Sequence, residues 1–415
     1  MKKAKNLLLI SVGVIILGMS ILYSCKNYTG PSNGQGLFAD KEKANNVDSG
    51  EDSAGTQILT PDSQRVVVWA DSGIIPALTV TKDNTLIAAV GDKNNKGKIL
   101  IKTSKDSGKT WNLCNEEIKS ENIIKGIAHP FFINCHNGEI LLGIATTNAG
   151  EDTVSFYRGS ANATGWKKGA KIEKSKNPQN QSSKTLTPGN AFATYGNGIA
   201  LRHGNNANKN TLLFPYYYKD TTKNSGVIST MISTNDGKHW EPYGNDEGPY
   251  ASYGAKFIEL NDGNILYFMS DNFKKVGWFE SKDCGKTSKC ITLFNVGAHN
   301  EDRIEYADFA RYEFDGRDIK GAEYALMVFS TDKTSYSVKM TTDDFNKGQK
   351  NKSGTYLGGG SKVIAANLTK PSAIYPTITV LKDGTIATLA AEDDGMVFRR
   401  FELNWFLEDE LWMEQ

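Results

Sequence analysis

A short motif recurs along the chain, a turn rich in Gly, Asp or Asn that leads directly into an apolar strand. Copies with the turn are DNTLIAAV (83–90), NGEILLGI (137–144), KNTLLFPY (209–216), DGNILYFM (262–269) and DGTIATLA (383–390), and YALMVF (324–329) fits the strand alone. The strands begin near Leu86, Ile140, Leu212, Ile265, Leu326 and Ile386, at intervals of 53 to 72 residues. Six similar β units at such a period indicate a closed repeat array.

The repeat predicts an all-β fold, a six-bladed β-propeller. One blade alone exposes a hydrophobic face, whereas six blades stacked in a ring bury all of these faces. Two-residue periodicity and frequent glycine turns argue against helices. A ring must also close, so we expect RVVVWA (65–70) to pair beside VFRRFELNWF (397–406) and complete the last blade.

A second motif, TSKDSGKTW at 103–111, places a Trp directly after a turn-forming stretch. It returns at 233–240 with the acid shifted by one position, at 281–287 without the aromatic residue, and in weaker form at 160–166 and 341–345. Ser and Asp side chains hydrogen-bond to the backbone of tight turns, and Gly supplies the conformation that other residues avoid. We interpret the motif as a structural clasp whose Trp is buried between strands, so its Asp is not a catalytic acid.

The charge balance excludes a class of partners. The 415 residues include 48 Lys and Arg against 47 Asp and Glu, so nothing indicates a polyanion such as nucleic acid. No cysteine spacing is typical of a metal knuckle, and we expect no cofactor and no metal. Cys114, Cys135, Cys284 and Cys290 allow three disulfide connectivities, and free buried thiols are the alternative.

The N-terminus reads as an export signal. A basic start, MKKAKN, precedes the apolar run LLLISVGVIILGMSIL, and Leu22-Tyr23-Ser24-Cys25 resembles the bacterial lipobox, in which the Cys is lipidated. The division expected is a signal peptide at 1–24, lipidated Cys25 with a flexible tether at 25–57, and a propeller at 58–410. The domain is then extracytoplasmic and lipid-anchored to a bacterial membrane; an uncleaved membrane anchor is the alternative.

The clasp motif S-x-D-x-G-x-T-W is the Asp box, and its repeated use on a six-bladed array resembles the bacterial exo-sialidases over about residues 62–406. AIYPTITVLKDGTIATLAAEDD (373–394) is similar to the family segment that carries the catalytic Tyr. The resemblance implies release of terminal sialic acid from glycoconjugates by a monomer. A Tyr oxygen attacks, a Glu activates it, an Asp acts as acid or base, and three Arg hold the substrate carboxylate.

Residue by residue, the resemblance assigns the nucleophile to Tyr375. Glu392 matches the Glu that orients the first Arg, and Asp92 in the loop 92–98 matches the Asp. The structural, non-catalytic alternatives are a buried core tyrosine for Tyr375, a solvated turn for Glu392 and a turn residue for Asp92.

Other family positions are altered. Ile74 stands where the first Arg belongs, Ser270 where the second belongs and Lys333 near the third, and the Glu partner of the Tyr falls near Gly254. Losing two charged hydrogen bonds costs about 3–6 kcal/mol. The chain contains eight Arg, so those in loops are candidate substitutes. The substrate-binding candidates are Arg202, Arg303, Arg311 and Lys333, with ordinary surface pairing as their alternative.

Two functions follow from this pattern. The first is a surface-anchored exo-α-sialidase, a retaining glycosidase with a nonstandard carboxylate clamp. The second is a glycan-binding lipoprotein or adhesin that keeps the scaffold and has lost the chemistry, because fold alone does not establish activity.

Overall fold

The computed structural model describes residues 58–70, 73–95, 97–119, 128–146, 152–160, 162–173, 186–204, 210–220, 225–244, 255–271, 275–295, 304, 306–314, 325–330, 333–341, 361–371 and 374–407. All of them belong to one unit, Gln57–Gln415. The expected signal peptide, Cys25 and the tether therefore lie outside the described residues. Among the described residues, no helix is long and apolar enough to cross a bilayer.

Six antiparallel sheets follow one another along the chain. Blade 1 contains β2 (Gly73–Val80), β3 (Leu86–Asp92), β4 (Lys98–Ser104), β5 (Asn112–Leu113) and β6 (Ile118–Lys119). Blade 2 contains β7 (Ala128–Asn134), β8 (Ile140–Thr146), β9 (Asp152–Gly159) and β10 (Lys167–Glu173). Blade 3 contains β11 (Leu186–Ala193), β12 (Ile199–Ala200), β13 (Leu212–Asp220), β14 (Ser225–Ser233) and β15 (Glu241–Gly244).

The second half repeats the arrangement. Blade 4 contains β16 (Lys256–Glu259), β17 (Ile265–Asp271), β18 (Lys275–Ser281) and β19 (Lys289–Asn295). Blade 5 contains β20 (Tyr306–Arg311), β21 (Ala325–Ser330), β22 (Tyr336–Thr341) and β23 (Ser361–Ala365). Blade 6 contains β24 (Thr377–Val380), β25 (Ile386–Glu392), β26 (Gly395–Phe401) and β1 (Arg65–Trp69), and a short helix follows, α2 (Leu403–Leu407).

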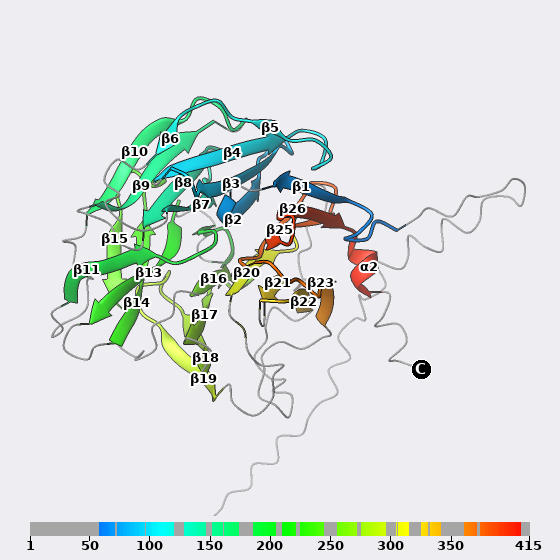
Figure 1. The fold of residues 1–415 in the computed structure, drawn as a ribbon. Helices are drawn as coiled ribbons and strands as arrows, with labels where there is room; N and C mark the ends of the chain where they lie inside the picture. Colours follow the sequence, from blue (N-terminus) through cyan, green and yellow to red (C-terminus); the bar gives the residue numbers. More distant parts are fainter. Residues whose placement is uncertain are drawn as a thin grey trace, which may run out of the picture. The chain divides into compact units, whose positions relative to one another are not determined.

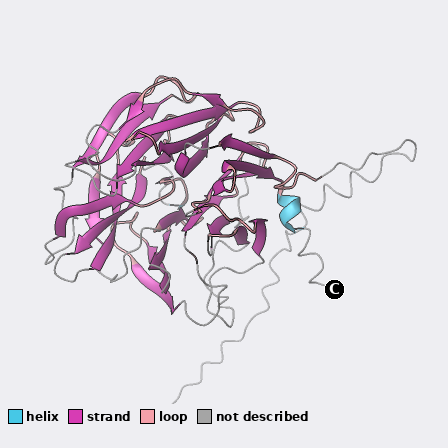
Figure 2. Ribbon diagram, viewed as in Figure 1, coloured by secondary structure: helices cyan, strands magenta, loops and turns pink. Residues whose placement is uncertain are grey.

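The innermost strand of each blade precedes its apolar second strand, and we call it the first strand. The first strands are β2, β7, β11 continued by β12, β16, β20 and β24. First strands of neighbouring blades contact one another and close a ring. β2 contacts β7, β7 and β16 contact β12, β16 contacts β20, and β24 contacts both β20 and β2. The N-terminal strand β1 pairs antiparallel with β26, so the two ends of the domain share blade 6. Figure 1 shows the blue β1 beside β26, and Figure 2 shows the predominance of strands. The predicted six-bladed β-propeller is confirmed.

The repeated apolar segments become the second strand of each blade. β3, β8, β13, β17 and β25 begin at the residues named from the sequence, and β21 begins one residue earlier, at Ala325. The closing pair is also confirmed, but the expected strand over 397–406 is too long. β26 ends at Phe401 and residues 403–407 are helical.

Apolar side chains fill the spaces between adjacent sheets. Phe131 and Phe156 of blade 2 pack with Phe214 and Trp240 of blade 3, and Trp240 stacks on Phe156 with ring centroids 5.1 Å apart. The same arrangement joins blades 6 and 1. Because each sheet buries both of its faces, the second strands read as continuous apolar runs.

The turns that follow the third strands have a common hydrogen-bond pattern. At 104–110 the Ser104 hydroxyl accepts from the Gly108 amide (2.8 Å), and Asp106 accepts from the Thr110 amide (2.9 Å). The turn after Ser233 has the same pattern with Asn235 in the acid's place, which accounts for the shifted acid of that copy. The turn after Ser281 repeats it again. These polar side chains are bonded to their own turns, as the clasp interpretation predicts.

Gly108 is the residue of this turn where a side chain is least tolerated. Its φ is +89°, and a Cβ added there would overlap the ring of Phe398. We expect Gly108→Ala to lower the free energy of unfolding by about 1–3 kcal/mol, through backbone strain and overpacking. Gly165 is the matched control, because its φ is +66° and nothing lies within 4 Å of an added Cβ. Urea denaturation should show the larger loss for Gly108→Ala; equal losses would contradict the packing role of Phe398.

None of the three described candidate disulfide cysteines, Cys114, Cys135 and Cys284, is in a disulfide. Cys114 is half-buried, Cys135 is buried, and burial raises the pKa of Cys135 to about 11. The side chain of Cys290 lies outside the described residues, but each of its three possible partners is in no disulfide. The structure therefore contains none of the disulfides that the sequence allows within the chain.

Candidate functional site

The first strands of the blades all run from one end of the ring to the other. Tyr375 precedes β24, Tyr306 opens β20, and Tyr195 follows β11. The Tyr375 ring lies 4.1 Å from that of Tyr306 and 5.0 Å from that of Tyr195, measured between centroids. We call Tyr195, Tyr306 and Tyr375 the tyrosine cluster, and the end of the ring where they meet the mouth.

The described floor of the mouth is narrow. Ile75, Pro76, Gly196 and Lys256 line it together with the tyrosine cluster, around a cavity of about 10 Å³. That is the space of about one water molecule or one ligand oxygen. Residues 71–72, 245–254, 296–303 and 372–373, which precede four of the first strands, lie outside the described residues.

Lys256 places a cation in this floor. The residue is 3% exposed, and its ammonium has no hydrogen-bond partner among the described residues. It lies against Gly196, where any side chain would overlap the Lys256 ammonium, and Asp308 flanks the same glycine. Asp308 is bound elsewhere, because one of its carboxylate oxygens accepts from the Thr377 hydroxyl at 2.6 Å. The ammonium is therefore held ready for a negatively charged oxygen at little reorganisation cost.

Burial lowers the pKa of Lys256 to about 8, against the attraction of Asp308. In the unfolded chain the group titrates near 10.5. Between these values the unfolded state holds a proton that the folded state has released, so stability should rise with pH from about 8 to about 10.5. Below pH 8 the cost of the buried charge is fully present, on the order of 3 kcal/mol. Lys256→Met should lose this rise in urea denaturation; an unchanged pH profile would contradict the assignment.

A neutral histidine supports the cluster from blade 2. His129 is fully buried, its Nε2 lies 3.0 Å from the Ala193 carbonyl oxygen, and its ring is 4.8 Å from that of Tyr195. Burial, with a smaller effect of the nearby Lys256 charge, lowers the pKa of His129 to about 4. His129 is thus uncharged at neutral pH, and Lys256 is the cation of the floor.

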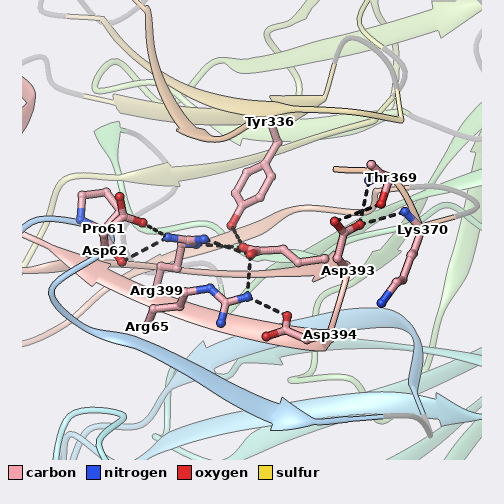
Figure 3. A network of polar contacts seen from close by, with 10 residues as sticks. Pro61, Asp62, Arg65, Tyr336, Thr369, Lys370, Asp393, Asp394 and Arg399 are labelled. Carbon is pink, nitrogen blue, oxygen red and sulfur yellow. Dashed lines mark hydrogen bonds and ion pairs between the residues drawn. The ribbon is translucent and has the colours of Figure 1, made fainter. Parts of the chain in front are cut away.

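Glu392, assigned from the sequence to the catalytic residues, belongs to a separate network on blade 6. Its partners Arg65, Tyr336 and Arg399 are labelled in Figure 3. Its carboxylate accepts from Arg399 Nε at 2.8 Å and Nη2 at 2.9 Å, from the Tyr336 hydroxyl at 2.9 Å and from Arg65 at 3.1 Å. Arg399 also pairs with Asp62. The network joins the N-terminal segment, blade 5 and blade 6, so Glu392 stabilises the ring closure in this structure.

Asp92 lies at the mouth end of blade 1, one strand outward from the floor. It ends β3, opposite Gly73 at the start of β2, and its side chain accepts from the Asn94 amide at 2.9 Å. Lys333 is exposed in the connection after β21, and Ser330 at the end of that strand pairs with Tyr306, so this connection is also at the mouth end. Arg303 lies outside the described residues.

The structure does not bring Arg202 and Arg311 together with Tyr375. Tyr306 is the first residue of β20 and Arg311 is the last, so roughly 17 Å of strand separates Arg311 from Tyr306 and the tyrosine cluster. Arg202 lines the same far end of the ring. The sequence reasoning placed these arginines beside the mouth, and the direction of the first strands places them opposite it.

Lys256, Tyr195, Tyr306 and His129 were missed. Tyr306 and Lys256 are the opening residues of their first strands, as Thr377 is of β24, and they line the floor together with Pro76 of β2. Once the order of the blades is known, a residue at the start of a first strand is expected at the mouth, and this position could have identified Tyr306 and Lys256. The family resemblance instead led to arginines as the candidate substrate-binding residues.

No family model matches the chain. A sialidase of Micromonospora viridifaciens is 25% identical over 372 residues, which cover 80% of this chain and 51% of that protein. The chain thus spans about half the length of this curated relative.

Solved sialidase structures share the fold. The intramolecular trans-sialidase from Ruminococcus gnavus, in complex with oseltamivir carboxylate, matches with a TM-score of 0.54 and 13% identity over 82% of this chain and 97% of that one. Trypanosoma rangeli sialidase in complex with sialic acid matches with a TM-score of 0.55 and 16% identity, covering 83% of this chain and 56% of that one. The chain therefore has a sialidase-like fold and a distant sialidase relative.

Proposed function

We propose that this protein is an exo-α-sialidase-like retaining glycoside hydrolase that removes terminal sialic acid from glycoconjugates. The observation that carries the proposal is the position of Tyr375, half-buried at the mouth and in the same floor as the buried cation Lys256. The similarity to sialidases, one of them solved with sialic acid, supports the substrate class.

The chemistry explains why a phenol suits this substrate. Sialic acid carries its carboxylate on the anomeric carbon, so a carboxylate nucleophile would be repelled there, whereas a tyrosine oxygen is not. In the proposal the Tyr375 oxygen gives up its proton to water and attacks the anomeric carbon as the bond to the leaving oxygen breaks. Water then hydrolyses the glycosyl-tyrosine bond, and the two displacements together retain configuration. Asp92 is the assigned acid, which protonates the leaving oxygen and then takes a proton from the water.

Lys256 supplies the charge that the altered arginine positions lack. An ammonium is a point charge without the planar fork of a guanidinium, so it attracts one carboxylate oxygen without fixing both. The described floor has room for about one such oxygen. We therefore assign Lys256 to binding the substrate carboxylate, and we expect weaker binding than three arginines would give.

The proposal includes the cellular setting. We place the domain on the outer side of a bacterial membrane as a monomer, held through lipidated Cys25 and the segment 25–57. The supporting evidence is the basic start, the apolar run and the Ser24-Cys25 step of the sequence. Radiolabelled palmitate incorporation that disappears in Cys25→Ala is the expected result, and equal incorporation in both proteins would exclude the anchor.

A second function, glycan binding without turnover, has one observation in its favour. None of the six described arginines lines the described floor of the mouth, and each has hydrogen-bond partners elsewhere: Arg65, Arg158, Arg202, Arg311, Arg399 and Arg400. Incubation of the purified protein with a fluorogenic α-sialoside separates the two functions. Release of the fluorophore with the α-anomer as first product supports the hydrolase. Binding on a sialoglycan array without release supports the binding protein.

A further inference from the structure

A large cavity lies at the far end of the ring from the tyrosine cluster. Its volume is about 740 Å³, and all six blades contribute to its wall at the ends of their first strands. Small-molecule sites have volumes of roughly 300–1,000 Å³. The cavity is therefore large enough for a ligand that the proposed sialidase chemistry does not use.

One acidic group of this wall, Glu313, is already compensated by cations, and the carboxylate of a second, Glu259, accepts from the Arg202 backbone amide. Glu313 pairs with Arg311 Nε at 2.9 Å and with His203 at 2.8 Å, and the hydrogen bond to Glu313 raises the pKa of His203. Arg311 is also occupied, because it donates to the Glu259 carbonyl at 2.9 Å and to Asn261 at 2.6 Å. Arg311 and Glu313 thus build the wall and leave little net charge.

Arg202 is different, because most of its donors are unused. The residue is exposed, and among the described residues its guanidinium makes one hydrogen bond, from Nη2 to the Asn134 carbonyl at 3.2 Å. A guanidinium has five N–H donors. Its backbone amide donates to Glu259 at 2.6 Å, so the residue is fixed at its base while the charged end remains open to the cavity.

A second cation, Lys82, lies against the turn of blade 2 that Arg202 contacts. Lys82 of blade 1 lies along the Asn134–Gly138 turn of blade 2, with its Cδ 3.1 Å and its Nζ 3.4 Å from the position of a Cβ on Gly138. Arg202 of blade 3 bonds to Asn134 of that turn. Two exposed cations from different blades therefore flank one turn in the cavity wall, and among the described residues neither has a carboxylate partner.

We propose that this cavity binds a sugar that carries a carboxylate or a phosphate group, with the anion held between Arg202 and Lys82. The guanidinium fork matches both of these oxyanions. Half-buried Phe309 and Phe314, which line the opposite wall, offer aromatic surface for the sugar ring. The site is independent of the proposed hydrolase, since Tyr375 lies at the mouth.

Isothermal titration calorimetry of the Tyr375→Phe protein tests the site without turnover at the mouth, and the substitutions below separate the two sites. The probes are glucuronate, glucose 6-phosphate, inorganic phosphate and glucose. We expect glucuronate or glucose 6-phosphate to bind and glucose not to bind, and the better of the two acids identifies the source of the anion. Binding of inorganic phosphate as tightly as either sugar would mean an adventitious ion only and would overturn the proposal.

Substitutions locate the binding. Arg202→Gln and Lys82→Gln should each weaken the preferred probe about 10-fold or more, since each removes a charged hydrogen bond. Arg202→Lys, which keeps the charge without the fork, should fall between wild type and Arg202→Gln. Lys105→Gln, an exposed lysine in the β4–β5 turn, is the matched control and should bind as wild type. No binding by the parent protein, or equal binding by all variants, would refute the site.

Discussion

Tyr375→Phe should lower the turnover of an α-sialoside by roughly 1,000-fold or more, because it removes the proposed nucleophile and leaves only binding and electrostatic stabilisation. The ring contacts with Tyr306 and Tyr195 do not need the hydroxyl, so the fold should be preserved. Initial rates with a fluorogenic sialoside, together with melting temperatures of both proteins, measure the effect. KM should change much less than kcat.

Tyr306→Phe is the matched control for this prediction. It removes a hydroxyl from the neighbouring ring, whose centroid lies 4.1 Å from that of Tyr375, without removing the proposed nucleophile. Its turnover should remain within about 10-fold of wild type, a loss of at most one hydrogen bond. Equal losses in both variants would mean that the cluster acts through packing and that Tyr375 has no special chemical role.

Glu392→Ala should lower the free energy of unfolding by about 3–5 kcal/mol, because it leaves the guanidinium of Arg399 buried without its bidentate partner. The Glu392 side chain is 2% exposed and that of Arg399 is 7% exposed. The Tyr336 hydroxyl loses its acceptor in the same change. Urea denaturation monitored by tryptophan fluorescence measures the loss.

Asp394→Ala is the control for Glu392→Ala. Asp394 pairs with Arg65 at 2.6 Å, but its side chain is 47% exposed, so its loss should cost less than about 1 kcal/mol. If Glu392→Ala instead leaves stability unchanged and abolishes turnover, the residue is catalytic as the sequence resemblance implied. The double substitution Glu392→Met with Arg399→Met should recover part of the lost stability, since no unpaired charge remains.

The fold was predictable because its signals are local. Apolar runs after glycine turns mark the second strand of each blade, and their intervals give the number of blades. The pairing of β1 with β26 followed from the need to close a ring without open edges. Only the end of that strand was wrong: the sequence 403–407 becomes helix, where Trp405 packs edge-on against Phe401.

The site was less predictable because it depends on strand direction. A residue before a first strand lies at the mouth, whereas a residue between a first and a second strand lies at the far end. Arg202 precedes the second strand β13 and Arg311 ends the first strand β20, so both lie away from Tyr375. Lys256 was hidden for a different reason, because a lysine in a short strand is usually exposed, and only the assembled ring shows that it is buried.

The most direct test of the mouth as a catalytic site is to trap the covalent intermediate. The protein is incubated with 2,3-difluorosialic acid, digested, and its peptides are examined by mass spectrometry. The proposed mechanism predicts loss of the C2 fluoride and one 3-fluorosialyl adduct on the peptide that contains Tyr375, and no adduct in Tyr375→Phe. An adduct on another residue, or turnover of an α-sialoside by a protein that forms no adduct at Tyr375, would contradict it.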